Sequence, residues 1–157
     1  MKHKKVILIV LIIIWMITVF IFSGQVGKKS KKASTGIIEI IVNKIYDTSN
    51  MSEKEKADKI EDLQRPIRKL AHITIYTLGG AITLTFIDKF NITNKKKVIV
   101  SLMFCLIYAI LDEIHQYYVP GRSCEIRDVL IDTIGALLGI VIAYKLINNK
   151  KKNRIET

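Results

Sequence analysis

The stretch YAILDEIHQYYVPGR, residues 108–122, places two carboxylates, a histidine and an amide at the end of an uncharged apolar run. Ionisable groups inside a membrane are costly unless they are paired, hydrated or functional. A histidine beside a carboxylate can act as a general base or acid, and arginine can clamp a phosphate by bidentate contact. We therefore treat His72, Asp112 and Glu113 as candidate catalytic residues. The candidate binding residues are Arg68, Lys69, Tyr76, Gln116, Arg122, Asp128 and Asp132.

Four apolar segments must position these side chains, because each candidate lies in or beside one of them. The segments span residues 6–22, 70–87, 98–114 and 129–147. Seventeen helical residues extend about 26 Å, which is close to the ~30 Å hydrocarbon core of a bilayer. The expected fold class is therefore all-α, a polytopic membrane helix bundle with about four transmembrane helices in a single domain, residues 1–157.

The first apolar segment permits a second interpretation as a cleaved signal peptide, since basic residues precede it and small residues follow it. The segment is longer than the usual signal-peptide core, and no A-x-A-like site comes after it. We prefer the interpretation as an uncleaved membrane anchor.

A polar outer connection, residues 24–69, joins the first two segments. Within it, GIIEIIVNKIY at 36–46 predicts an amphipathic helix in the membrane interface, or alternatively a segment that dips into the membrane. Ser52 and Glu55 form a capping-box signature, so a solvated helix should begin there. Pro66 predicts that this helix breaks or bends before the second segment.

The composition also indicates a membrane protein. Half of the 157 residues are apolar, and 25 Lys and Arg against 14 Asp and Glu give a net charge of +11. The sequence has no basic stripe interleaved with aromatic residues, so nucleic acid is not an expected partner. The lysines instead lie between the apolar segments, as topology signals do.

Lysine and arginine in the short loops orient the bundle. They gather in residues 1–5, 88–97 and the basic tail 148–157, which predicts a plasma-membrane protein with both termini in the cytoplasm. The outer connection is also rich in lysine and runs against this rule. In this orientation the candidate residues share the outer end of the bundle.

Helical periodicity places the candidates on inward faces. At a spacing of four, His72 and Tyr76 share one side of the second segment. Asp128 and Asp132 share a side with the GALLG motif at 135–139, whose small-xxx-small spacing permits close helix approach. An ion-pair cluster that only holds the bundle together is the alternative to a functional site.

Residue spacing predicts neither a metal site nor a cofactor. His72, His115 and the aspartates are conceivable ligands, but the sequence has neither HExxH nor a zinc-type Cys/His spacing. Cys105 lies inside an apolar segment and Cys124 lies in a polar loop, so no disulfide is expected.

Three blocks together resemble the VanZ family of small integral membrane proteins. They are RKLAHITIYTLGG, YAILDEIHQYYVPGR and RDVLIDTIGALLG, preceded by FSGQ, and the resemblance spans about residues 23–140. On matching positions the family's polar residues fall on Lys69, His72, Tyr76, Asp112, Glu113, Gln116, Pro120, Arg122, Asp128 and Gly135. The family usually has Asn where this chain has Asp132, and often proline where it has Val26.

The resemblance implies a function in the cell envelope. Family members are associated with lowered susceptibility to glycopeptide antibiotics, teicoplanin more than vancomycin. The expected partners are membrane lipid and an anionic lipid-linked cell-wall precursor, bound at an outward-facing polar cluster. The alternatives are a membrane-embedded hydrolase or transferase acting on a lipid phosphate or cell-wall precursor, and a structural or regulatory subunit. The sequence makes no prediction of the oligomeric state.

Overall fold

The computed structural model describes residues 2–24, 36, 38, 40–44, 51–120 and 125–155. Its long helices are α1 (Lys2–Ser23), α3 (Glu53–Ile87), α4 (Asn94–Tyr117) and α5 (Ile126–Ile155). Each predicted transmembrane segment lies inside one of these helices, so the predicted all-α bundle is confirmed. Residues 36, 38 and 40–44 are also helical, within the segment where the sequence predicts an amphipathic helix. The position of that segment in the membrane interface stays a prediction.

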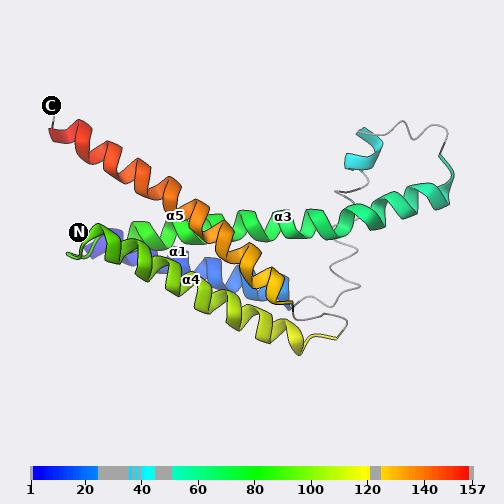
Figure 1. Ribbon diagram of the computed structural model, residues 1–157, viewed down its shortest axis with the longest axis horizontal. Coiled ribbons are helices and arrows are strands. Elements are labelled where there is room, and N and C mark those ends of the chain that lie inside the picture. Colours follow the sequence, from blue (N-terminus) through cyan, green and yellow to red (C-terminus); the bar gives the residue numbers. More distant parts are fainter. Residues whose placement is uncertain are drawn as a thin grey trace.

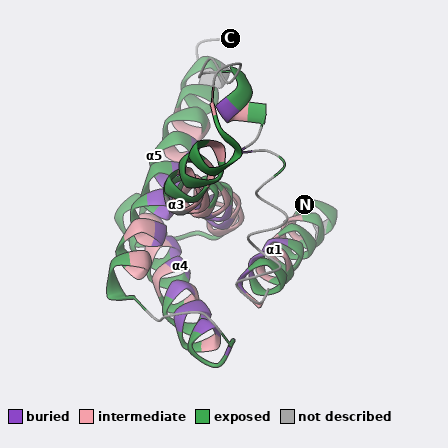
Figure 2. Cartoon of the chain, turned by 90° about the vertical axis from the view of Figure 1, so that its right-hand side faces the viewer, coloured by how far each residue is buried: buried purple, intermediate pink, exposed green. Residues whose placement is uncertain are grey.

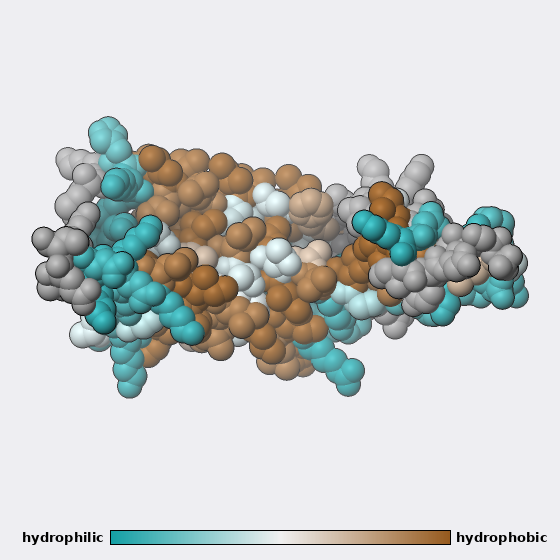
Figure 3. Space-filling model, turned by 90° about the horizontal axis from the view of Figure 1, so that it is seen from above, coloured by the Kyte–Doolittle hydropathy of each residue, from teal (hydrophilic) through white to brown (hydrophobic). Residues whose placement is uncertain are grey.

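The outside of the bundle is apolar, as a surface in contact with lipid should be. All four long helices are long and apolar enough to cross a membrane. Large side chains such as Ile17, Phe22, Leu111 and Leu146 are more than half exposed. Figure 3 shows a hydrophobic band over the middle of the molecule, with hydrophilic residues at both ends. By helix length and hydropathy, the chain is a multi-pass membrane protein.

Helix α3 begins at the predicted capping box and continues for 35 residues. The side chain of Ser52 accepts a hydrogen bond from the Glu55 backbone N–H, and the Glu55 carboxylate accepts one from the Ser52 N–H. Of the break or bend predicted at Pro66, the break is wrong, because the helix runs through this residue, and the bend stays a prediction. Proline removes one main-chain hydrogen bond, which a long helix can tolerate. The polar first half of α3 thus extends beyond the bundle as a continuation of the half that lies inside it (Figure 1).

Helix α3 is the centre of the bundle, because its contacts with the other three long helices are together more extensive than those of any other helix, and those with α5 are the most extensive of all. A Cβ atom at Gly139 of α5 would overlap the carbonyl oxygen of Thr77, and one at Gly80 of α3 would overlap that of Ala136. Small residues let two helix backbones approach this closely. The predicted packing role of the GALLG motif is therefore confirmed, and the close approach brings together the polar faces of α3 and α5.

Buried residues lie on the sides of the helices that face one another (Figure 2). On α1, the Trp15 indole packs against the bare backbone of Gly79 on α3, where a Cβ atom would overlap the ring. Its Nε1 donates a hydrogen bond of 2.8 Å to the carbonyl oxygen of Ile75. The ring also meets Tyr76 edge-on, with 5.6 Å between centroids. These contacts hold α1 against the middle of α3.

Candidate functional site

Three ionisable side chains from three different helices meet inside the bundle. His72 of α3, Asp112 of α4 and Asp132 of α5 each offer one atom, and these atoms all lie within 4.8 Å of one another. The meeting follows from the antiparallel order of the helices, which brings the end of α4, the beginning of α5 and the middle of α3 to one level. We call these three residues the inner cluster.

Asp112 is held in place by two hydrogen-bond donors. Ser23 Oγ, at the end of α1, donates to Asp112 Oδ2 at 2.8 Å, and Gln116 Nε2 donates to the same oxygen at 2.9 Å. All three side chains are buried. Helix α1 thus contributes Ser23 to the site, and this residue is not among the site residues predicted from the sequence. Its signal in the sequence is a small polar residue directly after an apolar segment.

Asp132 is the most deeply buried member of the inner cluster. Its side chain is 1 % exposed, and its Oδ1 lies 3.3 Å from Nδ1 of His72. Its Oδ2 has no hydrogen-bond partner among the residues that the structure describes. Tyr76, one turn from His72 on α3, is fully buried, and within the same described ranges its hydroxyl group also has no hydrogen-bond partner. At the centre of the site, buried polar atoms are thus left without partners among the residues that the structure describes.

A basic rim, which consists of Arg68 and Lys69 with Asp128, lies beside the inner cluster. Lys69 Nζ is 3.2 Å from Asp128 Oδ1, which makes an ion pair between α3 and α5. The two side chains are 37 % and 17 % exposed, which places the rim nearer to water than the inner cluster. Arg68 is half-buried next to Lys69, and Arg127 is exposed. Lys69, Asp128 and Arg68 can therefore meet a ligand that approaches from the end of the bundle.

Two of the residues that attract attention in the sequence lie outside the inner cluster. Glu113 Oε2 accepts a hydrogen bond of 2.9 Å from the backbone N–H of Glu125, directly before α5. This contact favours a structural role, and the catalytic role suggested for Glu113 stays a prediction. His115 stacks on Phe20 of α1, with ring centroids 4.1 Å apart. Arg122 lies outside the described residues.

A second charged cluster lies at the other end of the bundle and is missing from the predicted site residues. One Asp88 oxygen accepts hydrogen bonds from Lys97 Nζ of α4 at 2.8 Å and from Lys151 Nζ of α5 at 2.9 Å. Burial alone would raise the pKa of Asp88, but the two ammonium groups outweigh it and hold this pKa below its ordinary value. We call these three residues the Asp88 cluster.

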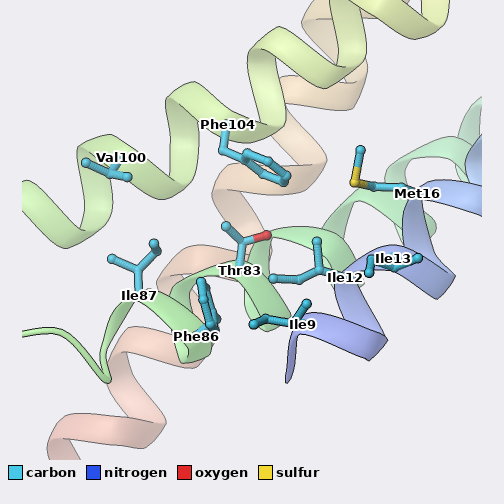
Figure 4. Close-up of a pocket in the computed structure, with 9 residues that line it drawn as sticks. All are labelled: Ile9, Ile12, Ile13, Met16, Thr83, Phe86, Ile87, Val100 and Phe104. Atoms are coloured by element: carbon cyan, nitrogen blue, oxygen red, sulfur yellow. The ribbon is translucent and has the colours of Figure 1, made fainter. Parts of the chain in front are cut away.

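A cavity of about 320 Å³ lies between α1, α3 and α4 (Figure 4). Its lining is mainly aliphatic and aromatic, with Ile9, Phe86 and Phe104 among its side chains, and none of the described residues that line it is ionisable. Such a lining cannot hold a polar ligand by specific contacts. The residue types that chemistry needs are gathered in the inner cluster and not in this cavity.

The inner cluster is suited to three kinds of chemistry. An imidazole beside a buried carboxylate can accept and return a proton. Two carboxylates and an imidazole can bind a cation. The rim can contact the oxygen atoms of an anionic headgroup at the end of the bundle.

Comparisons with known proteins identify the family of the chain. No curated protein and no solved structure matched it. The model of the family described as VanZ/LLP1 matches residues 8–148, which include all four long helices in large part and every member of the inner cluster. The chain therefore belongs to the VanZ/LLP1 family.

Proposed function

We propose that this protein lowers susceptibility to lipophilic glycopeptide antibiotics such as teicoplanin, through the polar cluster at the outer end of its helix bundle. The observation that carries the proposal is the convergence of His72, Asp112 and Asp132 on one buried point. Ionisable residues inside a membrane bundle usually serve a function. The association of the family with lowered glycopeptide susceptibility, which the family resemblance implies, supplies the phenotype to be tested.

The ligand in this proposal is the anionic headgroup of a lipid-linked cell-wall precursor. Lys69 and Arg68 at the rim can contact its phosphate oxygens. The carboxylates deeper in the bundle can accept hydrogen bonds from its hydroxyl or amide groups. A precursor held in this way is less accessible to a lipophilic glycopeptide in the same membrane.

The proposal requires the protein to lie in the plasma membrane with the inner cluster facing outward and both chain termini in the cytoplasm. Support comes from the opposite end of the bundle, which carries Lys97, Lys151 and the basic tail. Cytoplasmic loops of membrane proteins are enriched in lysine and arginine.

Teicoplanin susceptibility of a sensitive host tests the function. The strains carry an empty vector, the natural protein, Asp112→Asn, or the exposed control Asp58→Asn from the polar half of α3. At matched membrane levels, we expect the natural protein and Asp58→Asn to protect, and Asp112→Asn to lose most of the protection, because it removes a charge from the inner cluster. A natural protein without protection contradicts the proposal, and equal protection by Asp112→Asn excludes the inner cluster from it.

Maleimide labelling in intact cells tests the orientation separately. Cys105 is fully buried in α4, so a membrane-impermeant maleimide should react with Cys124 in the connection between α4 and α5. Labelling that occurs only after lysis would place the inner cluster on the cytoplasmic side and contradict the outward orientation.

A membrane-embedded hydrolase or transferase is the second candidate function, and the contact between His72 and Asp132 favours it. A buried carboxylate beside an imidazole orients the ring and supports general-base catalysis on a lipid phosphate or cell-wall precursor. The enzyme predicts a product in lipid extracts, found by mass spectrometry, that disappears with His72→Gln. Binding alone predicts unchanged lipid composition, and a charge-preserving change such as Lys69→Arg should keep much of the protection.

A further inference from the structure

The inner cluster contains more negative than positive groups. Asp112 and Asp132 are 4 % and 0 % exposed, and one imidazole, that of His72, faces both of them. Removal of a carboxylate from water costs several kcal/mol unless an opposite charge compensates it. One imidazolium can balance only one of the two carboxylates. Among the three residues of the cluster, and within the part of the chain that the structure describes, one positive charge is therefore lacking when both carboxylates are ionised.

Hydrogen bonding gives an independent indication that a group is missing from the inner cluster. The large majority of buried side-chain polar atoms in proteins have a hydrogen-bond partner. Asp132 Oδ2 and the hydroxyl group of Tyr76 are exceptions within the described ranges, although both residues are fully buried. Tyr76 lies one turn from His72 on the same face of α3. Asp132 Oδ2 belongs to the cluster itself, and Tyr76 is an electrostatic neighbour of both Asp112 and Asp132.

The dimensions of the cluster fit a single ion. In a tetrahedral site with bonds of about 2.1 Å to the metal, two ligand atoms lie about 3.4 Å apart. The three offered atoms lie within 4.8 Å of one another, so a pair at that limit must close by about 1.4 Å. Side chains on packed helices can make such a movement by small rotations about their χ angles.

We propose that His72, Asp112 and Asp132 together bind one divalent transition-metal ion, with Zn²⁺ as the preferred occupant. One nitrogen and two carboxylate oxygens suit ions of borderline hardness better than Mg²⁺, which favours an all-oxygen shell. The ion supplies two positive charges to two carboxylates and gives Asp132 Oδ2 a partner. The three ligands leave at least one position for water or for a phosphate oxygen of a ligand.

The surroundings of Asp112 resemble the outer shell of a metal site. Ser23 and Gln116 both donate to Oδ2 of this carboxylate, which fixes its orientation and leaves Oδ1 for the ion. Such outer-shell donors orient metal ligands in proteins, and their loss weakens metal affinity about 10- to 100-fold. Four helices therefore contribute to the site, three through ligands and α1 through Ser23.

Metal titration of the purified full chain tests the proposal, and its result is independent of the antibiotic phenotype. The chain is purified in detergent without a histidine tag, stripped with a chelator and titrated with Zn²⁺, Mn²⁺ or Mg²⁺. Bound metal is measured by elemental analysis, and the unfolding temperature by circular dichroism. We expect about one Zn²⁺ per chain and a rise in the unfolding temperature, with a smaller response to Mg²⁺.

Variants distinguish the proposed site from adventitious binding. Asp132→Asn and His72→Gln should each weaken Zn²⁺ binding by at least about 100-fold. His115→Gln, which changes the neighbouring histidine stacked on Phe20, should bind as the natural protein does. If a variant does not fold, the titration of the natural protein is the deciding measurement. Substoichiometric metal without a thermal shift in the natural protein, or equal binding by folded Asp132→Asn, overturns the proposal.

Discussion

The two charged clusters at opposite ends of the bundle use similar residue types in different proportions. In the Asp88 cluster, one carboxylate oxygen accepts hydrogen bonds from both Lys97 and Lys151. In the inner cluster, the carboxylates of Asp112 and Asp132 face one imidazole. The first cluster is complete within the protein, whereas the second has unused capacity for a positive group. The balance of charges thus separates a structural contact from a candidate site.

Burial alone would not separate the two clusters. The Asp88 side chain is 10 % exposed and that of Asp132 is 1 % exposed, so both carboxylates are largely removed from water. Each cluster also joins α3, α4 and α5. The number of cationic groups for each carboxylate is what differs, and it can be changed by mutation.

The largest expected effect comes from Gly139→Leu, which disturbs the α3–α5 contact on which both clusters depend. A side chain at this position overlaps the Thr77 carbonyl, and backbone cannot move aside as a flexible side chain can. We expect a loss of about 3 kcal/mol in the free energy of unfolding, measured by thermal unfolding in detergent. Leu138→Ala, on the half-exposed lipid side of the same helix, should change it much less. An unchanged unfolding temperature in Gly139→Leu would contradict the close packing.

An intermediate effect is expected from replacing one carboxylate in each cluster by its amide. Asp88→Asn should lower the free energy of unfolding by about 2 kcal/mol, because Lys97 and Lys151 lose their charged acceptor. Asp132→Asn in metal-free protein should be neutral or stabilising, because it removes a buried charge that lacks full compensation. Equal destabilisation by the two changes would show that the inner cluster is as well balanced as the Asp88 cluster.

The smallest expected effect is the pH dependence of the contribution that Asp88 makes to the free energy of unfolding. The pKa of Asp88 is lower in the folded protein than its ordinary value of 3.8. A carboxylate of this kind stabilises the folded protein fully when the pH is above its pKa in the unfolded chain. This stabilisation is lost as the pH falls through its lower pKa in the folded protein. The difference in unfolding temperature between the natural protein and Asp88→Asn should therefore be constant near neutral pH and narrow below about pH 4. A difference that persists in strong acid would mean that the carboxylate charge is not its cause.

Much of the fold follows from the sequence, because membrane spans are long and uniform in character. The four apolar segments predict the four long helices, and the Ser52 and Glu55 pair predicts where α3 begins. The break expected at Pro66 is wrong because proline removes only one main-chain hydrogen bond, and the 35-residue helix continues on both sides of it. A single helix-breaking residue is thus a weak signal inside a long helix.

The candidate site is predictable in part. Periodicity and depth bring His72, Asp112 and Asp132 to one level, and the structure places them together. Ser23 and the Asp88 cluster are not predictable in this way, because their members lie at the ends of separate helices and have no shared spacing in the sequence. Lys97 and Lys151 lie in segments whose charge is fully explained by membrane topology. Their pairing with Asp88 becomes apparent only when the helix ends are placed in space.

The contact between α1 and α3 also gives the protein a built-in optical reporter. Trp15 is the only tryptophan in the chain, and its indole is buried, hydrogen-bonded to α3 and 5.6 Å from the ring of Tyr76. Its emission spectrum therefore depends on how α1 sits against the helix that carries His72. Ligand-induced movement of these two helices can be followed in bilayers by intrinsic fluorescence, without a dye and without an added mutation.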